Sequence, residues 1–354
     1  MSIFAFHAGD YGFLPNHWYA PFIPDQAVSL FYVLSGFILH YTYRNKISGV
    51  GWPRFFFLRL ARIWPLHLFA LLVYFLALPG SFQFWWNALS WTGFVANVLM
   101  LQAWFLDPAI HFSINGVAWS ISDEMLFYAT FPLLCVAAVR ARLRFAVAAA
   151  VLFLAYSVIG TGVASHVNHG TSLFTTFPFG RIFEFCLGIL AAETVYDRRI
   201  PSQTYASATA AEMLAVALVF LSSGAIGWAT HLSIFADHMA IRSQIRQIGT
   251  APVFAIMIGV LSMGKGMVSR MLSTRPMVLL GEISFAMYLL HQIFLRVFAE
   301  RHLFEPVSFA ACFIFTLVVS LIAHFMIERR IYETAKRWSR NRSLLAVSSG
   351  SSNI

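Results

Sequence analysis

Long apolar stretches fill this chain, and short polar or basic segments separate them. An α-helix needs about 17–25 apolar residues to cross a bilayer. Runs of this kind predict membrane-crossing helices at residues 27–43, 63–79, 117–139, 145–164, 176–195, 208–229, 249–264, 277–297 and 307–327. The apolar run from Met1 to His7 is shorter, and it predicts the end of a further helix whose beginning is missing.

The run at residues 86–105 is ambiguous, and the distribution of charge decides its place. Basic clusters occur at residues 44–62, 140–144, 198–199, 265–275 and 329–342. Lys and Arg in short loops are retained on the cytoplasmic side, and all of these clusters share that side only if 86–105 does not cross. We therefore predict a re-entrant or interfacial segment, in agreement with its internal Asn87, Asn97 and Gln102.

This topology places the loop from His7 and Asp10 to Asp25 on the outer side. It also places Arg242 and Arg246 outside, against the same rule, and a ligand-facing loop would explain that exception. The Ser-rich residues 343–354 predict a disordered cytoplasmic tail after a membrane domain of residues 1–342.

Composition points to the same compartment. The chain has 59% hydrophobic and 11% charged residues and a mean hydropathy of +0.71, whereas soluble domains contain roughly 25% charged residues. The sequence thus predicts an all-α fold, a polytopic membrane helix bundle of about ten transmembrane helices, the first incomplete. The net charge of +9 comes from loop arginines, so the expected partner is a lipid bilayer and not nucleic acid.

The three cysteines, Cys135, Cys186 and Cys312, all lie within apolar stretches. Their odd number rules out a simple disulfide framework, and their spacing is not that of a zinc site. We expect them to be packing residues, and we expect no metal.

Residues 119–128 carry the most informative chemistry, because they place acid and hydroxyl groups inside an apolar run. A carboxylate buried in a membrane costs several kcal/mol unless a neighbour compensates, so it is a functional candidate. The structural alternative is a helix cap from Ser120 to Asp123 or Glu124. Further polar clusters in similar apolar settings favour the functional interpretation.

Five segments, taken in order, resemble the acyltransferase 3 family of integral-membrane enzymes that O-acylate surface polysaccharides. They are FYVLSGFI at 31–38, RxxRIxP at 59–65, NGxxWSxSxExxFY at 115–128, GRxxEFxxG at 180–188 and GEISxxxYLLH at 281–291. The resemblance covers nearly the whole chain and implies an acyltransferase of the class that transfers groups other than aminoacyl groups. It implies cytosolic acyl-CoA, such as acetyl-CoA, as donor substrate, with no bound cofactor. The implied acceptor is a hydroxyl of an extracytoplasmic carbohydrate, for example an exopolysaccharide or O-antigen.

The same resemblance implies a multi-pass protein of the inner membrane whose C-terminus is cytoplasmic. Two features depart from the family pattern. Relatives usually have a full first helix with an Arg-Gly-type start before the histidine, whereas this chain opens six residues before His7. Many relatives also have an aspartate where this chain has Ser29.

His7 is the candidate for proton transfer, because a histidine titrates near neutral pH and can accept a hydroxyl proton and then release it. The resemblance points to the same histidine. Asp10 lies three residues later and is the candidate to orient the imidazole and stabilise its cation. The structural alternative for His7 is a terminal histidine at the membrane surface.

Arg59 and Arg62 are expected to open the span 63–79 from the cytoplasmic side. Their spacing of three places both guanidinium groups on one helix face, where they can bind the phosphates of coenzyme A. Arginines also flank membrane helices for topology alone, which is our interpretation of Arg54.

Glu124, with Trp119 and Ser122, is expected to line the cavity where donor and acceptor meet. We assign Glu124 to catalysis and Trp119, Ser122 and Arg181 to acyl-CoA binding. Arg181 is also a candidate partner for Glu124, since a membrane-embedded ion pair is less costly than either charge alone, and that pair would serve structure equally well.

Tyr288 and His291 share a helix face near the end of an apolar stretch. They are either acceptor-site residues or a polar pair between helices. Two other functions stay open for the chain. A transporter or exporter of acylated glycan or lipid would use intramembrane His and Glu for proton relay, although the halves of the chain show no inverted repeat. The second alternative is that the chain is a truncated, non-catalytic relative of the family.

Overall fold

Helices account for all the regular structure in the described parts of this computed structural model, which are residues 2–14, 26–78, 88–197, 204–233, 238–302 and 306–350. The long helices are α2 (Gln26–Tyr43), α4 (Trp52–Ala77), α7 (Trp119–Arg140), α8 (Arg142–Ala164), α10 (Pro178–Asp197), α11 (Tyr205–Ala229), α15 (Arg275–Glu300), α16 (Pro306–Ala323) and α17 (Arg329–Gly350). The short ones are α1 (Ser2–Asp10), α3 (Ile47–Val50), α5 (Ala88–Val98), η3 (Gln102–Trp104), α6 (Pro108–His111), α9 (Ser172–Thr175), α12 (Met239–Ile248), α13 (Ala251–Ser262), α14 (Met267–Leu272) and η5 (His324–Glu328).

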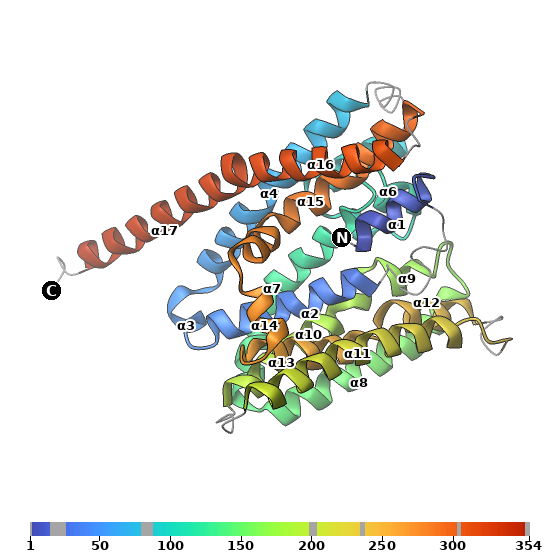
Figure 1. The fold of residues 1–354 in the computed structure, drawn as a ribbon. Helices are drawn as coiled ribbons and strands as arrows, with labels where there is room; N and C mark the ends of the chain where they lie inside the picture. Colours follow the sequence, from blue (N-terminus) through green and yellow to red (C-terminus); the bar gives the residue numbers. More distant parts are fainter. Residues whose placement is uncertain are drawn as a thin grey trace.

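Among the described residues, 8 helices are long and apolar enough to cross a membrane. Each corresponds to one of the spans expected from the sequence, and the remaining expected span, 27–43, is α2. The fold is therefore a polytopic all-helical bundle, as the sequence predicted. Figure 1 shows α8 and α11 along one edge of this bundle, while α17 projects away from it.

Two helices begin well before the apolar runs that predicted them. The predicted span 63–79 is α4, which starts at Trp52, and the predicted span 249–264 is the last part of a helical segment that starts with α12 at Met239. Polar side chains lower the hydropathy of these first turns without breaking the helix. Arg242 and Arg246 consequently lie in a helix, and their expected position in a loop is wrong.

The described part of the segment 86–105 contains no helix long enough to cross a bilayer. Its helix α5 has 11 residues, about 16 Å of helix against about 30 Å of hydrocarbon. Its polar residues attach it to the bundle: Asn97 Nδ2 donates to Ser113 Oγ over 2.9 Å, and Gln102 Nε2 donates to the Ala118 carbonyl over 2.6 Å. Asn87 and the loop to Asp25 lie outside the described residues.

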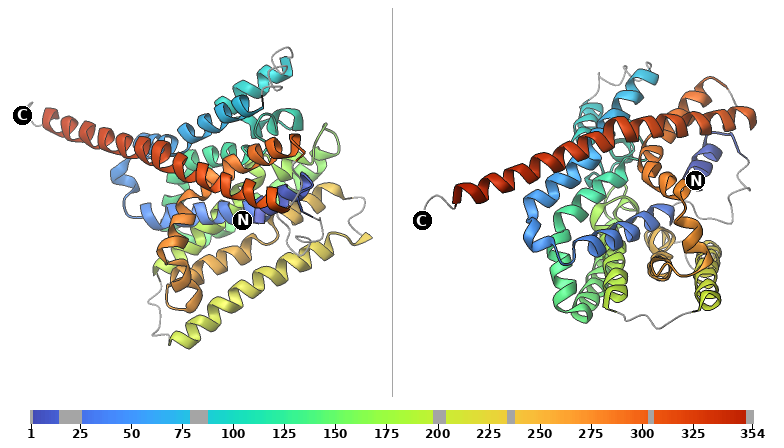
Figure 2. Two further views of the ribbon diagram at one scale, coloured as in Figure 1. Left: turned by 45° about the horizontal axis from the view of Figure 1, so that its top comes forward. Right: turned by 60° about the vertical axis from the view of Figure 1, so that its left-hand side comes forward.

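Three described elements from the predicted basic clusters lie at one end of the bundle. In Figure 1, α3, α14 and the C-terminal end of α17 are on the left, whereas α6, α9 and α12 are on the right. The two views in Figure 2 also show α17 leading away from the bundle. Residues 343–350 belong to α17, where the composition predicted disorder, and 198–199 and 351–354 lie outside the described residues.

Helices α2 and α10 form the centre of the bundle because two glycines allow their backbones to touch. A β-carbon at Gly36 would overlap the carbonyl of Phe185, and one at Gly188 would overlap the carbonyl of Val33. Only glycine permits such close helix packing. By contrast, α8 buries only Phe145 and Gly160, so most of its apolar surface faces outward, as expected for contact with lipid.

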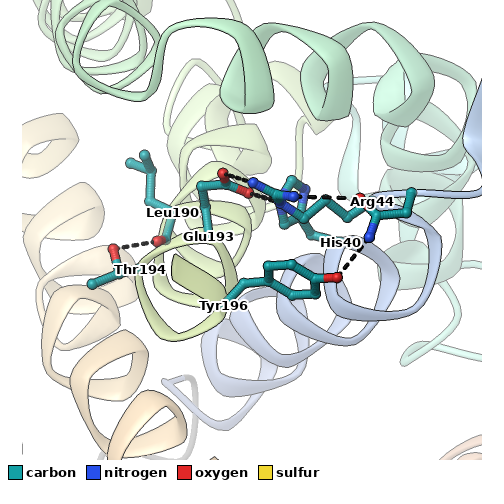
Figure 3. A network of polar contacts seen from close by, with 7 residues as sticks. His40, Arg44, Leu190, Glu193, Thr194 and Tyr196 are labelled. Atoms are coloured by element: carbon teal, nitrogen blue, oxygen red, sulfur yellow. Dashed lines mark hydrogen bonds and ion pairs between the residues drawn. The ribbon is translucent and has the colours of Figure 1, made fainter. Parts of the chain in front are cut away.

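A charged cluster at the basic end fixes the same two helices (Figure 3). The carboxylate of Glu193 on α10 lies 2.5 Å from Nε2 of His40, which is in α2. It also accepts two hydrogen bonds of 2.8 Å from Arg44, the residue that follows α2. The Arg44 guanidinium also lies 4.3 Å from the centre of the Tyr196 ring. This cluster holds the register of α2 on α10, which in turn positions the polar groups at the other end of α2.

Candidate active site

Two cavities share Tyr288 of α15 in their linings. We call the first the histidine cavity; its volume is about 410 Å³, and its polar lining consists of His7, Asp10, Tyr11, Tyr74, Asn115, Thr175, Thr176, Gln247, Tyr288, Gln292 and Arg296. We call the second the arginine cavity; its volume is about 220 Å³, and its polar lining consists of Tyr32, Ser35, Arg59, Arg62, Ser120, Glu124, Tyr128, Ser284 and Tyr288. Tyr288 belongs to both.

The histidine cavity contains the pair expected from the sequence. His7 Nδ1 lies 3.3 Å from Asp10 Oδ2, because α1 continues through Asp10 and places residues three apart on one face. A carboxylate only accepts hydrogen bonds, so Nδ1 is the His7 nitrogen that can donate in this contact. The His7 side chain is 18% exposed, which leaves it accessible from the cavity.

His291 packs against His7, with 5.3 Å between the ring centres. Its Nδ1 lies 2.6 Å from the Tyr288 carbonyl, which only accepts hydrogen bonds, so Nδ1 carries a proton. Its Nε2 is buried without a hydrogen-bond partner in the described part of the chain. The contact with Tyr288 joins the His291 ring to the backbone of Tyr288 within α15, and it is not a polar pair between helices. The His291 ring instead packs against the ring of His7.

Tyr11 and Arg296 close the side of the histidine cavity near Asp10. Arg296 donates to Tyr74 Oη over 3.2 Å and to Glu300 over 3.1 Å. Burial raises the pKa of the Tyr11 phenol, while the Arg296 guanidinium opposes that rise. Tyr11 therefore stays a neutral hydrogen-bonding group at neutral pH.

Tyr288 borders both cavities. Its hydroxyl lies 2.8 Å from Ser120 Oγ and 2.8 Å from the Val117 carbonyl. Val117 comes two residues before α7 and Ser120 lies in its first turn, so these bonds join α15 to the beginning of α7. Ser120 lines the arginine cavity and Val117 the histidine cavity.

The arginine cavity collects charged groups that already have partners. Arg59 Nη2 donates to Tyr43 Oη over 3.0 Å, and the Tyr128 hydroxyl donates to Glu124 Oε2 over 2.7 Å. Arg62 Nε lies 3.6 Å from Glu328 Oε1. Both arginines lie inside α4, and the expectation that they mark its start is wrong.

The Arg62 contact comes from an unusual turn. Glu328 is the last residue of η5, a π-helical turn between α16 and α17, and its Oε2 lies 2.9 Å from His324 Nδ1. Such turns carry one extra residue and often occur at functional sites. Glu328 was not singled out from the sequence, because nothing in a single chain links residue 328 to residue 62.

Arg181 pairs with Glu184, and not with Glu124 as expected. Arg181 Nε lies 2.8 Å from Glu184 Oε2, and Nη1 donates to Gln247 Oε1 over 2.8 Å. The other Glu184 oxygen accepts a hydrogen bond from Ser29, the residue that replaces the family aspartate. Three residues apart in one helix turn, Arg181 and Glu184 are natural partners, so the predicted pairing was wrong.

The residues assigned to acyl-CoA binding are therefore divided by the structure. Arg59 and Arg62 line the arginine cavity, Trp119 lines the histidine cavity, and Ser122 and Arg181 line neither. Ser122 and Arg181 are both fully buried. Asp123, next to Glu124, accepts a 2.6 Å hydrogen bond from Tyr32 in the same interior.

The described residues contain no group of three or more His, Cys, Asp or Glu side chains arranged to hold a metal. Cys135, Cys186 and Cys312 are free thiols buried in helices. Each packs in an apolar layer, as the sequence predicted for them.

Comparisons with known proteins bear on this site. A family model described as "Acyltransferase domain" matches residues 1–325. Acyltransferase MdmB of Streptomyces mycarofaciens is 40% identical over 116 residues, which are 30% of this chain and 27% of that protein. Protein 2 in the picA locus of Rhizobium radiobacter is 31% identical over 121 residues, which are 30% of this chain and 63% of that protein. The matches thus cover less than two thirds of either relative, and no solved structure matches the chain.

Proposed function

Because the chain belongs to the acyltransferase 3 family, we propose that it is a membrane O-acyltransferase that moves an acyl group, such as acetyl, from coenzyme A to a carbohydrate hydroxyl. One observation carries the proposal: an arginine-bearing cavity and a histidine-bearing cavity meet at a single side chain, Tyr288. A donor and an acceptor that enter from opposite ends of the bundle would meet there.

The arginine cavity suits the donor. Coenzyme A carries phosphates, and Arg59 and Arg62 can bind them through charge-assisted hydrogen bonds. Glu328 holds Arg62 in position in the absence of a phosphate, so the donor would compete with a contact of 3.6 Å. The aromatic and aliphatic remainder of this cavity, including Phe31 and Ile63, would surround the apolar part of the thioester arm.

The histidine cavity suits the acceptor and the chemical step. The acceptor oxygen would attack the thioester carbonyl while its proton passes to His7 Nε2. The carbon–sulfur bond then breaks, and the departing coenzyme A thiolate takes the proton back from His7. Asp10, held at 3.3 Å from Nδ1, would stabilise the imidazolium between these two transfers.

The topology in this proposal places the basic end in the cytoplasm of a cell whose inner membrane holds the protein. Reporters fused after Arg144 and after the C-terminal residue should both read cytoplasmic. A reporter signal from the outer side at Arg144 would require 86–105 to cross and would separate the arginine cavity from cytosolic coenzyme A.

The direct test of function compares surface polysaccharides from host cells with and without the gene. We expect one sugar to lose the mass of an acyl group in the deletion strain and to regain it with the wild-type gene. Purified protein in lipid nanodiscs should then release coenzyme A thiol from acetyl-CoA in proportion to that glycan. Unchanged acylation in the deletion strain, together with no thiol release, would rule the proposal out.

A further inference from the structure

Two amide oxygens in the histidine cavity are buried without a hydrogen-bond donor in the described part of the chain: Asn115 Oδ1 and Gln292 Oε1. Neither takes part in the proton transfer proposed above. Buried acceptors normally find donors, so such atoms require an explanation. Asn115 is 1% exposed and lines this cavity.

The orientation of Asn115 is fixed by its other atom. Its Nδ2 donates to the Leu289 carbonyl over 2.8 Å, which leaves the oxygen as the free end. Because Asn115 comes just before α7 and Leu289 lies on α15, this bond holds the two walls of the cavity together. The free oxygen is therefore held by the fold and does not turn away.

The absence of a side chain at Gly116 leaves the space that the end of Gln292 occupies. A β-carbon at Gly116 would come within 2.8 Å of Gln292 Oε1 and 3.2 Å of Nε2. Since the backbone of Gly116 needs no unusual angle, the glycine is required here by space alone. Any larger residue would push the end of Gln292 out of its position.

We propose that Asn115 Oδ1 and Gln292 Oε1 form a subsite that binds hydroxyl groups of a polyol acceptor next to its reacting hydroxyl. Amide oxygens accept and do not donate, so the ligand has to supply O–H groups. The aromatic lining residues Tyr74, Phe112 and Trp119 offer flat apolar faces against which a sugar ring packs. This subsite rests on the proposed function, because it takes the acceptor to enter the histidine cavity.

Sugar binding to the full chain in lipid nanodiscs tests the subsite by saturation-transfer NMR. The probes are methyl α-D-glucopyranoside and its fully O-methylated derivative, which has the same ring but no O–H donor. We expect wild type to bind the first and not the second. Gln292→Leu should weaken binding of the free sugar about threefold to tenfold, as expected for the loss of one neutral hydrogen bond.

A second variant reaches Gln292 indirectly. Gly116→Ala should weaken sugar binding as much as Gln292→Leu, and the double variant should be no weaker than Gln292→Leu alone. The matched control is Gly162→Ala on α8, where nothing lies within 4 Å of the added carbon. Coenzyme A binding should be the same in every variant, because Gln292 and Gly116 lie outside the arginine cavity.

The outcomes separate the subsite from the proposed function. Equal binding of both probes by wild type, wild-type affinity in Gln292→Leu, or no binding of the free sugar would each overturn the subsite, whatever the transfer assay shows. Sugar binding that depends on Gln292, in a protein that never transfers acetyl from acetyl-CoA, would keep the subsite and remove the acyltransferase proposal. Variants of Asn115 are less useful, because its Nδ2 also holds α15.

Discussion

The two cavities differ in how their polar groups are satisfied. In the arginine cavity, the charged side chains Arg59, Arg62 and Glu124 each have a polar partner, on α2, η5 and α7 respectively. Within that set, Arg59 Nε is the atom that has no partner among the described residues. In the histidine cavity, the neutral acceptors Asn115 Oδ1 and Gln292 Oε1 have none among the described residues. An unpaired charge in a membrane is very unfavourable, so charged groups need partners even when no ligand is bound. A neutral acceptor without a donor costs less free energy, so it can remain unpaired until a ligand binds.

The elements that build the two cavities differ as well. Long helices, α2, α4, α7 and α15, supply most of the arginine cavity. The short helices α1, α9 and α12 and the segment 112–117 before α7 contribute much of the histidine cavity. A rigid frame suits a donor of constant structure, and short elements between helices can vary with the acceptor without changing the frame.

The largest expected effect tests whether chemistry belongs to the histidine cavity. His7→Ala should lower turnover by roughly 10²–10⁴-fold, because a positioned base contributes that much in the transition state. Coenzyme A binding and thermal stability should stay at wild-type values. His7→Gln should be no better, since its amide does not take up the proton.

Complementation of a deletion strain measures this effect in cells. If His7→Ala restored full acylation, the proton transfer would have to be reassigned to Glu124 or His291. If Glu124 took over the proton transfer, the chemical step would belong to the arginine cavity, which Glu124 lines.

A large effect on folding, but not on binding, is expected at Arg181. Breaking a buried ion pair costs about 3–5 kcal/mol, since the remaining charge loses its partner. Arg181→Met should therefore lower the stability measured by denaturant unfolding in detergent. The double variant Arg181→Met with Glu184→Leu should recover much of the loss.

Coenzyme A affinity decides what this loss means. The folded fraction of Arg181→Met should bind coenzyme A as wild type does, because Arg181 lines neither cavity. Weak coenzyme A binding at normal stability would instead return Arg181 to the donor site, as the sequence had suggested.

The sequence predicted what depends on neighbouring residues and missed what depends on distant ones. Hydropathy located the helices, and a spacing of three brought His7 to Asp10. The same spacing of three, in GRxxE, matches the partner that Arg181 has in the structure, whereas the distant Glu124 was the partner expected from the sequence. Local spacing was the better guide, because both side chains leave one helix face.

Other parts of the site had no local signal. Hydropathy placed the start of α4 at residue 63, since Arg54, Arg59 and Arg62 lower the mean although the helix continues through them. Two contacts join residues that are far apart in the chain. They are the close approach of Gln292 to Gly116 and the ion pair of Arg62 with Glu328. Packing decides such contacts, and one sequence without its fold does not reveal them.

A smaller effect should separate donor binding from chemistry in the arginine cavity. Arg59→Ala and Arg62→Ala should each weaken coenzyme A binding by about 1.5–3 kcal/mol, the range for hydrogen bonds to charged groups. Arg54→Ala is the control, because Arg54 lies on α4 outside the cavity lining. Isothermal titration of matched protein amounts gives the comparison, and equal affinity in all three variants would remove Arg59 and Arg62 from the donor site.

The smallest expected effect lies at the boundary of the cavities. Tyr288→Phe keeps the ring that stands between them but removes the hydroxyl that bonds to Ser120 and Val117. One or two neutral hydrogen bonds are lost, so the boundary should loosen by about 1–2 kcal/mol. With α15 less firmly held to α7, water should reach the thioester more often.

We therefore expect a several-fold rise in hydrolysis of acetyl-CoA without acceptor, measured as thiol release, and a smaller fall in transfer. Ser120→Ala removes one of the same two partners and should show the same change to a lesser degree, whereas Ser284→Ala, which loses only a bond to Gly281 in its own helix, should not. If Tyr288→Phe hydrolysed acetyl-CoA at the wild-type rate, the two cavities would have to be connected through another residue, and Tyr288 would be a packing side chain that happens to border both.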